Sequence, residues 1–168
     1  MRRIRAVTAL VVVPLSVPAM QGCNPHQYDS VPSVTDVRSS ELTGTWRGLD
    51  GTRVVLKADG TAEVARLDGQ EFDFDEGWRL SGTGTWRLTD RPSGWGDGQH
   101  VSLKVTRRTA AETREPEDGE PRASQDGEPA PKAYTWTLEM ERGEKGLRLF
   151  FLFGDPDSRS YYVLQRAG

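Results

Sequence analysis

From Leu42 onward, the chain consists of short runs rich in Val, Thr, Trp, Tyr and Phe, separated by Gly and Asp. Such runs predict β-strands joined by tight turns, and no window shows the sustained 3.6-residue period of an amphipathic helix. The clearest pair is 52–67, because Asp59-Gly60 between alternating runs favours a type I′ hairpin, whose two central residues need positive φ. The alternation places Val54, Leu56, Ala62 and Val64 on one face, and Arg53, Lys57 and Glu63 on the other.

Six further runs bring the expected strands to eight. The sequence therefore predicts an all-β fold, an antiparallel up-and-down meander that closes into a small barrel, because closure removes the two exposed sheet edges. In the run 146–153 both faces are apolar, so Phe150 and Leu152 need cover of their own or mark a binding surface. The expected strands are 42–48, 52–58, 61–67, 82–89, 99–107, 133–141, 146–153 and 159–166.

The N-terminal residues 1–22 are typical of a signal peptide. Three arginines precede an apolar run of 15 residues, Ala6 to Met20, which is shorter than the roughly 20 residues of a membrane-spanning helix. Gly22-Cys23 resembles the end of a bacterial lipobox, which implies that Cys23 carries a diacylglyceryl anchor on the extracellular face of the cell membrane. The alternative is a secreted protein with an unpaired thiol.

Composition limits the other partners. Cys23 is the only cysteine, so no intrachain disulfide forms, and lipidation would consume an otherwise exposed thiol. Removing residues 1–22 removes three of the 22 basic residues and none of the 25 acidic ones, which leaves a formal charge of −6. No basic patch remains that would indicate a nucleic-acid partner.

Two polar segments frame the domain boundaries. Residues 23–40 are expected to be a flexible tether between the lipid and a barrel domain over 41–168. Residues 108–132 are acidic and rich in proline, with almost no large apolar side chain. Such a segment buries too little surface to offset its ordering entropy, so we expect a disordered insertion.

The stretch TGTWR occurs twice, at 43–47 and 83–87. Gly44-Thr45-Trp46 resembles the first-strand motif of lipocalins, in which the tryptophan closes one barrel end under an arginine of the last strand, a role that falls to Arg166. The repeat is interpreted as two inward-packing positions, with a ligand-gripping pair of tryptophans, Trp46 and Trp86, as the alternative. The runs LTGTWRG, LKADGTAEV, SGTGTWRL and GDPDSRSYYVLQR together resemble a group of uncharacterised actinobacterial lipoproteins.

Few residues of the sequence occur in patterns that indicate catalysis or metal binding. His26 and His100 have no local partners that would form a catalytic or metal motif, and Asp73 and Asp75 belong to a charged loop without calcium-binding spacing. No nucleophile elbow, phosphate loop or cysteine pair occurs, so we expect neither an enzyme nor a cofactor nor a metal. Trp95 in a glycine-rich loop is expected either to contact a sugar or partner or to cap the barrel.

The sequence thus predicts a lipid-anchored barrel of one of two kinds. In the first, an apolar or amphipathic ligand, or an envelope component, binds in or at the mouth of a barrel lined by Trp46, Trp86, Trp136 and Arg166. In the second, the same side chains fill the core, and an envelope interaction or inhibitor protein acts through its surface loops. Strand alternation alone serves both.

Overall fold

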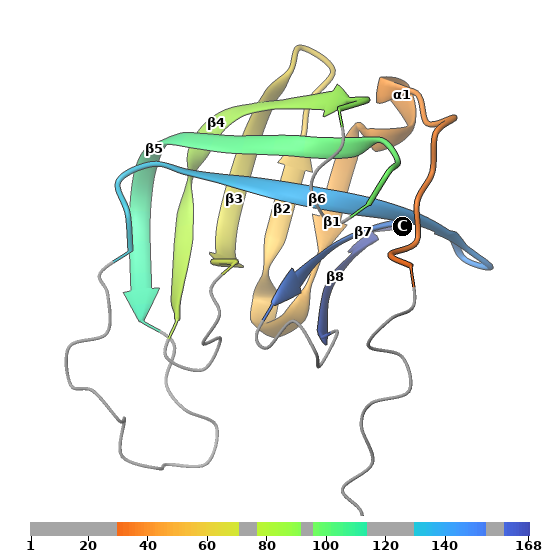
Figure 1. Ribbon diagram of the computed structural model, residues 1–168. Coiled ribbons are helices and arrows are strands. Elements are labelled where there is room, and N and C mark those ends of the chain that lie inside the picture. The colour runs from red at the N-terminus through yellow and green to blue at the C-terminus, as the bar shows by residue number, and fades with distance from the viewer. Residues whose placement is uncertain (1–29, 71–76, 92–95, 114–129, 154–159) are drawn as a thin grey trace, which may run out of the picture.

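In a computed structural model of the protein, the described residues are 30–70, 77–91, 96–113, 130–153 and 160–168. Within these ranges, eight antiparallel strands follow one another in sequence order around a closed barrel (Figure 1), so the predicted fold class is confirmed. No helix in the described ranges has the length and apolar character to cross a membrane. The strands are β1 (Gly44–Arg47), β2 (Arg53–Leu56), β3 (Thr61–Asp68), β4 (Trp78–Thr89), β5 (His100–Thr113), β6 (Tyr134–Gly143), β7 (Gly146–Phe153) and β8 (Ser160–Arg166).

Two short helical elements mark the ends of the barrel. The helix α1 (Ser39–Leu42) precedes β1 at the end that carries the β2–β3 turn, at the top of Figure 1. The 3₁₀ helix η1 (Leu49–Gly51) connects β1 to β2 at the opposite end. We call these the α1 end and the η1 end.

The β2–β3 hairpin has the predicted faces but a different turn. Val54, Leu56, Ala62 and Val64 are buried, as expected from the alternation. Only Gly60 of the turn has positive φ, at 81°, and its amide donates to the Lys57 carbonyl over 3.1 Å. The expected type I′ turn is therefore wrong, because a longer turn with a single left-handed glycine, in the manner of a G1 bulge, connects the strands.

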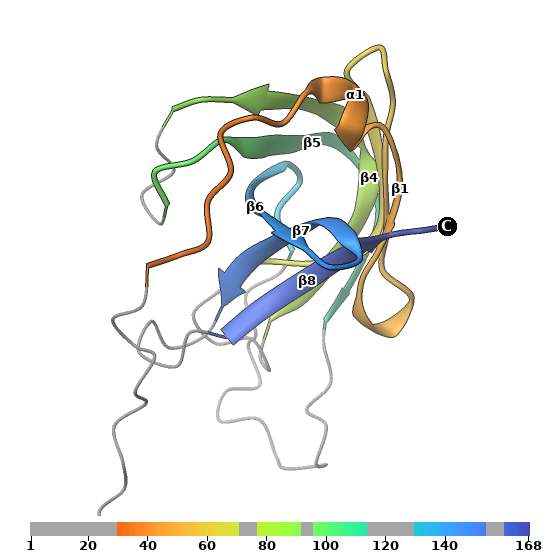
Figure 2. The ribbon, with the colours of Figure 1, turned by 90° about the vertical axis from the view of Figure 1, so that its right-hand side faces the viewer.

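The segment before α1 is packed rather than free. Val31 and Val37 are buried, and Val34 packs against the core, so every third residue of this extended stretch is an apolar contact. The Gln99 amide donates to the Val34 carbonyl over 2.7 Å. The expected tether over 23–40 is therefore too long: the folded domain begins by residue 31, and the segment runs along one side of the barrel (Figure 2).

Both ends of the expected insertion, 108–132, contain residues that belong to the fold. Residues 108–113 belong to β5, which pairs with β4 as far as Thr113↔Trp78. Ala130 packs against the core, and only 114–129 of the expected 108–132 lie outside the described residues. Sequence patterns missed this part of β5 because its residues are exposed on both faces and show no apolar alternation.

The core is one apolar cluster inside the barrel. Trp46, Trp136, Phe151 and Tyr162 are among its largest fully buried side chains, and Phe151 stacks on Tyr162 with ring centroids 4.7 Å apart. On the second apolar face of β7, Phe150 is 1% exposed and meets the edge of Tyr161 at 5.0 Å, so the cover that its pattern required is present.

Close backbone contact at Gly84 provides a sharp test of this fold. An added Cβ would lie 1.8 Å from the Lys104 carbonyl oxygen, at a β-bulge between β4 and β5. We expect Gly84→Ala to lower the free energy of unfolding by about 3 kcal/mol or more, because two backbones must separate. Urea denaturation followed by tryptophan fluorescence measures the change.

Gly143→Ala is the matched control, because its added Cβ finds its nearest neighbour, the Gly146 carbonyl oxygen, at 3.9 Å. It should change stability by less than about 1 kcal/mol. Equal losses for the two variants would contradict the close approach at Gly84.

Candidate functional site

The three tryptophans expected to line the barrel are all buried, and each has committed its indole N–H to the backbone. Trp46 donates to the Leu42 carbonyl over 2.9 Å, Trp86 to Lys57 over 2.8 Å, and Trp136 to Asp68 over 2.7 Å. Trp46 lies next to α1, Trp86 next to the β2–β3 turn, and Trp136 next to the end of β3. The three indoles therefore fix separate chain connections and do not converge on one polar pocket.

Arg166 lies over Trp46, at 5.6 Å between the guanidinium carbon and the ring centroid. Its two Nη atoms donate to the carbonyls of Glu41 and Thr43. Trp46 and Arg166 are also register partners in the β1–β8 pairing. A cation over an indole is favourable, so this arrangement closes the α1 end.

The two TGTWR copies use their glycines for different reasons. Gly44 has φ of 135°, and an added Cβ would lie 3.0 Å from Nη2 of Arg166. Gly84 instead permits the bulged backbone approach to Lys104 described above. The tryptophans are equivalent only in being buried with satisfied indoles, so the repeat is a packing device built twice on different local constraints.

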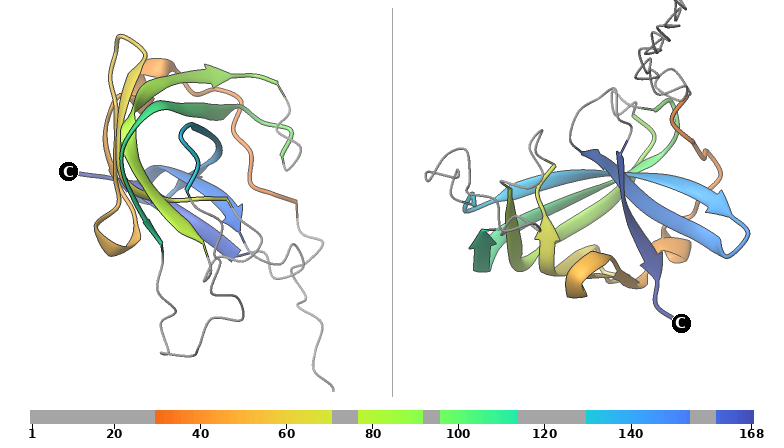
Figure 3. Two further views of the ribbon diagram at one scale, coloured as in Figure 1. Left: turned by 90° about the vertical axis from the view of Figure 1, so that its left-hand side faces the viewer. Right: turned by 90° about the horizontal axis from the view of Figure 1, so that it is seen from below.

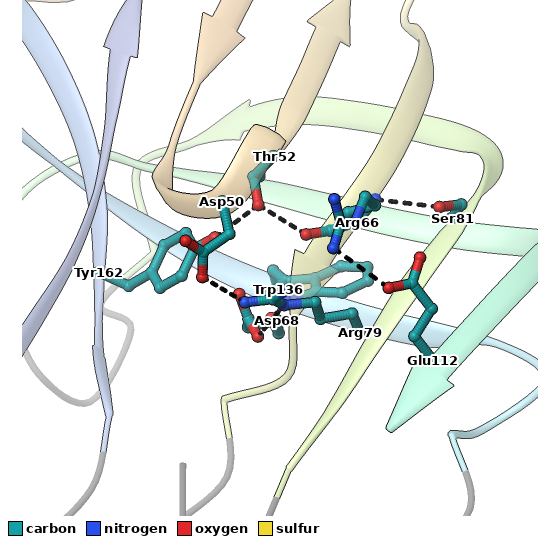
Figure 4. Close-up of polar contacts among 9 residues, drawn as sticks. All are labelled: Asp50, Thr52, Arg66, Asp68, Arg79, Ser81, Glu112, Trp136 and Tyr162. Carbon is teal, nitrogen blue, oxygen red and sulfur yellow. Dashed lines mark hydrogen bonds and ion pairs between the residues drawn. The ribbon is translucent and has the colours of Figure 1, made fainter. Parts of the chain in front are cut away.

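A polar cluster occupies the η1 end. Figure 4 shows side chains from η1, β3, β4 and β8 that converge beside Trp136. Arg79 donates through Nε to Asp68 over 3.0 Å and through Nη2 to Asp50 over 2.5 Å. Thr52 and Tyr162 share a hydroxyl hydrogen bond of 2.6 Å, and Thr52 donates to the Arg66 carbonyl over 2.6 Å. The Tyr162 hydroxyl is then the donor to Thr52.

The charged side chains of this cluster are buried, which affects their pairing and their pKa values. Asp68 is 2% exposed and Arg79 is 9% exposed, which is rare for ionised side chains unless they are paired. Burial alone lowers the pKa of Arg79, but the hydrogen bonds and charges of Asp68 and Asp50 outweigh it and leave that pKa raised. Burial also raises the pKa of Tyr162 above its ordinary value. The cluster thus holds a protonated phenol beside an ion pair.

Aromatic rings flank the cluster. Trp78, Tyr134 and Trp136 meet edge to face, with Tyr134 at 4.8 Å from Trp78 and at 4.7 Å from Trp136. The backbone N–H of Gln70 donates to the Tyr134 hydroxyl over 3.2 Å. Trp136 joins these rings to the cluster, because its indole N–H donates to the Asp68 carbonyl.

The cluster was not among the residues expected from the sequence. Its members are far apart in the chain, with 110 positions between Thr52 and Tyr162. One local signal existed, because Asp68 and Arg79 are only 11 positions apart in the chain and are cross-strand partners in the β3–β4 register. Of the sequence-predicted residues, Cys23, His26, Asp73, Asp75 and Trp95 lie outside the described ranges.

His100 is the remaining buried titratable group of interest. It is 7% exposed at the start of β5, and its Nδ1 atom has no hydrogen-bond partner among the described residues. Within the described part of the chain, no three or more His, Cys, Asp or Glu side chains lie together in a group that could hold a metal ion.

We expect the effects of substituting Asp68 and Arg79 on the free energy of unfolding to depend on each other. Arg79→Met should lower the free energy of unfolding by about 3 kcal/mol, because it removes the cation beside a buried carboxylate. The double variant Asp68→Asn with Arg79→Met should cost less than the sum of the single changes. Urea denaturation of the four proteins completes the cycle.

The exposed Lys57–Glu63 pair, at 2.6 Å, is the control for this cycle. Lys57→Met should change stability little, because water screens surface ion pairs. Additive losses at Asp68 and Arg79 would show that the two side chains do not support each other.

Ionisation of Tyr162 is expected to destabilise the folded protein in alkali. Its pKa is raised in the folded protein, so its contribution is complete below the unfolded pKa of about 10 and is lost progressively as the pH rises from that value toward the higher folded pKa. Tyr162→Phe should reduce the fall in unfolding free energy between pH 9 and pH 11, by up to about 1.4 kcal/mol per pH unit. Urea denaturation at both pH values measures it, and Tyr161→Phe is the neighbouring control. Equal effects of the two variants would contradict the assignment to Tyr162.

Comparison with known proteins assigns no family to the chain. No protein-family model matches the sequence, and neither a curated protein nor a solved structure matches it. The candidate site is therefore interpreted from its own geometry.

Proposed function

We propose that the protein is an exported, lipid-anchored barrel that acts through its surface on a component of the cell envelope, without catalysing a reaction. The observation that carries this proposal is the state of the three interior tryptophans. Trp46, Trp86 and Trp136 are 0%, 7% and 0% exposed, and all three indole N–H groups are bonded to backbone carbonyls.

A ligand held by these tryptophans would have to displace structural contacts. Removing Trp46 from its position breaks the stack with Arg166 and the bond to α1. Moving Trp136 breaks the bond to Asp68, whose side chain belongs to the ion pair. These couplings favour a filled core over a ligand-lined one, so the proposal adopts the surface mode rather than the barrel ligand.

The chemistry of the polar cluster supports a role without catalysis. The Asp68 carboxylate is committed to its ion pair with Arg79. The raised pKa of Tyr162 keeps its hydroxyl protonated, which makes it a poor nucleophile or base. Both groups serve better to hold η1 against β3, β4 and β8.

The anchor brings the barrel close to the membrane. Six residues, 24–29, separate Cys23 from the first described residue. Seven steps of ~3.4 Å give a span of at most about 24 Å. A lipid on Cys23 therefore holds the packed segment that begins at Val31 within a small distance of the lipid headgroups. Surface contacts with envelope components are then favoured by proximity.

Mass spectrometry of the protein extracted from the membranes of its own host tests the proposal. The denatured chain should begin at Cys23 and carry the added mass of a diacylglyceryl group. Under native conditions in mild detergent, the same sample should carry no small molecule beyond detergent and the covalent lipid.

The denatured mass tests the lipid anchor, and the native mass tests the filled core. An unmodified Cys23 would contradict anchoring, and Cys23→Ser is the matched control for the added mass. The parent protein could instead carry a stoichiometric small molecule that is lost in Trp136→Leu, while circular dichroism shows that the variant remains folded. That result would contradict the filled core and favour a barrel that binds a ligand in its interior.

A further inference from the structure

The β6–β7 hairpin and the end of β8 form a concave surface with a volume of about 460 Å³. It lies on the side of the barrel at which the chain ends, where β7 and β8 run side by side (Figure 2). Figure 3 shows the same hairpin projecting beyond the neighbouring strands. The volume is within the ~300–1,000 Å³ that small-molecule sites occupy.

Cationic side chains dominate the lining of this concavity. Lys145, Arg148 and Arg166 line it, against Glu144 in the lining and Glu141 beside it, which is paired with Arg148. The chain without its first 22 residues is acidic as a whole, so a local excess of positive charge stands out against the rest of the molecule. Electrostatics therefore favours an anion at this place.

Both arginines are held in position before any ligand arrives. Arg148 donates through Nε to Glu141 over 2.7 Å and also through Nη2 to the same carboxylate oxygen. Arg166 is fixed by the indole of Trp46 and by two backbone carbonyls. Binding a ligand to fixed side chains costs less conformational entropy than binding it to free ones.

Each arginine retains donors that these contacts do not use. A guanidinium carries five N–H groups, and two are committed in Arg148 and two in Arg166. Lys145 adds an ammonium from the turn between Gly143 and Gly146, which are register partners. Three cations thus border one concavity. The two arginines are held in place, whereas the lysine side chain can adjust to a ligand.

We propose that this concavity binds a phosphate or phosphate ester. A phosphate group carries about −1.5 to −2 charges and three acceptor oxygens, so it satisfies three cations better than a single carboxylate does. Leu147 supplies an apolar contact for the organic part of an ester. The inference rests on the proposed function in that it names the surface through which the barrel acts and the chemistry of its partner.

The test uses residues 23–168 with Cys23→Ser, ¹⁵N-labelled, and inorganic phosphate as the first probe. Phosphate replaces chloride at constant ionic strength, so that general screening does not change. We expect saturable shifts of the backbone amides of 143–148, 165 and 166. Lys145→Glu should weaken the binding about tenfold, the equivalent of one charge-assisted contact.

Lys104→Glu is the control, because it makes the same charge change at an exposed position on β5. It should leave the affinity within about twofold of the parent chain. Co-sedimentation with vesicles of phosphatidylglycerol and phosphatidylcholine, against phosphatidylcholine alone, is the second arm. Phosphatidylglycerol-dependent binding that Lys145→Glu weakens identifies a lipid headgroup as the source, whereas phosphate shifts without vesicle binding identify a soluble phosphate ester.

The inference is wrong if phosphate produces no saturable shifts around the hairpin and vesicle binding does not depend on Lys145. Equal weakening by Lys104→Glu and Lys145→Glu also overturns it, because it indicates a general charge effect. The chain used lacks acyl groups, so a negative result leaves the anchoring of Cys23 and the filled core to their own measurement.

Discussion

The seam between β1 and β8 is the constraint on which the barrel depends. Only Trp46↔Arg166 and Arg47↔Gln165 are paired there, whereas the other neighbouring strands share longer registers. An open seam would expose two strand edges and the buried face of the core. Arg166 compensates for the short pairing. Its guanidinium covers Trp46 and donates hydrogen bonds to the carbonyls of Glu41 and Thr43, which lie at the end of α1 and just after it.

The opposite end is closed by a different kind of interaction. The Asp68–Arg79 pair and the Thr52–Tyr162 hydrogen bond join the loop before β2 to β3, β4 and β8. Burying charges has a high desolvation cost that only complete pairing offsets, so such a cluster adds little net stability. Its effect is on specificity: a strand that slipped by one residue would bury Asp68 or Arg79 without its partner.

Local patterns predicted the parts of this fold that local chemistry determines. The faces of β2 and β3 follow from alternation, because a residue such as Val54 must point away from Arg53 and Val55 in any strand. The turn at Asp59 was predicted wrongly, since Asp-Gly also suits a longer turn in which only Gly60 is left-handed. The exposed half of β5 had no apolar alternation to reveal it, because pairing with β4 alone holds it in the sheet.

Long-range contacts account for what the sequence did not reveal. The valines at 31, 34 and 37 look like an unstructured linker until Gln99, 62 positions after Val37, provides hydrogen bonds to the segment. The Arg79 cluster likewise requires Asp50 on η1 and Asp68 on β3 to meet Arg79 on β4. Trp46 and Arg166 were paired in advance only because a resemblance to lipocalin motifs suggested it, and no periodicity in the chain connects the two positions.

Closure and surface chemistry meet at Arg166. The same guanidinium covers the indole of Trp46 inside the seam and borders the concavity beneath the β6–β7 hairpin. A residue with both duties has little freedom to change, because a substitution that altered the surface would also open the barrel. Lys145 has no such structural duty, since it lies in an exposed turn. The charge of the concavity can therefore be varied at Lys145 without altering the seam, and the barrel and its surface can be examined separately.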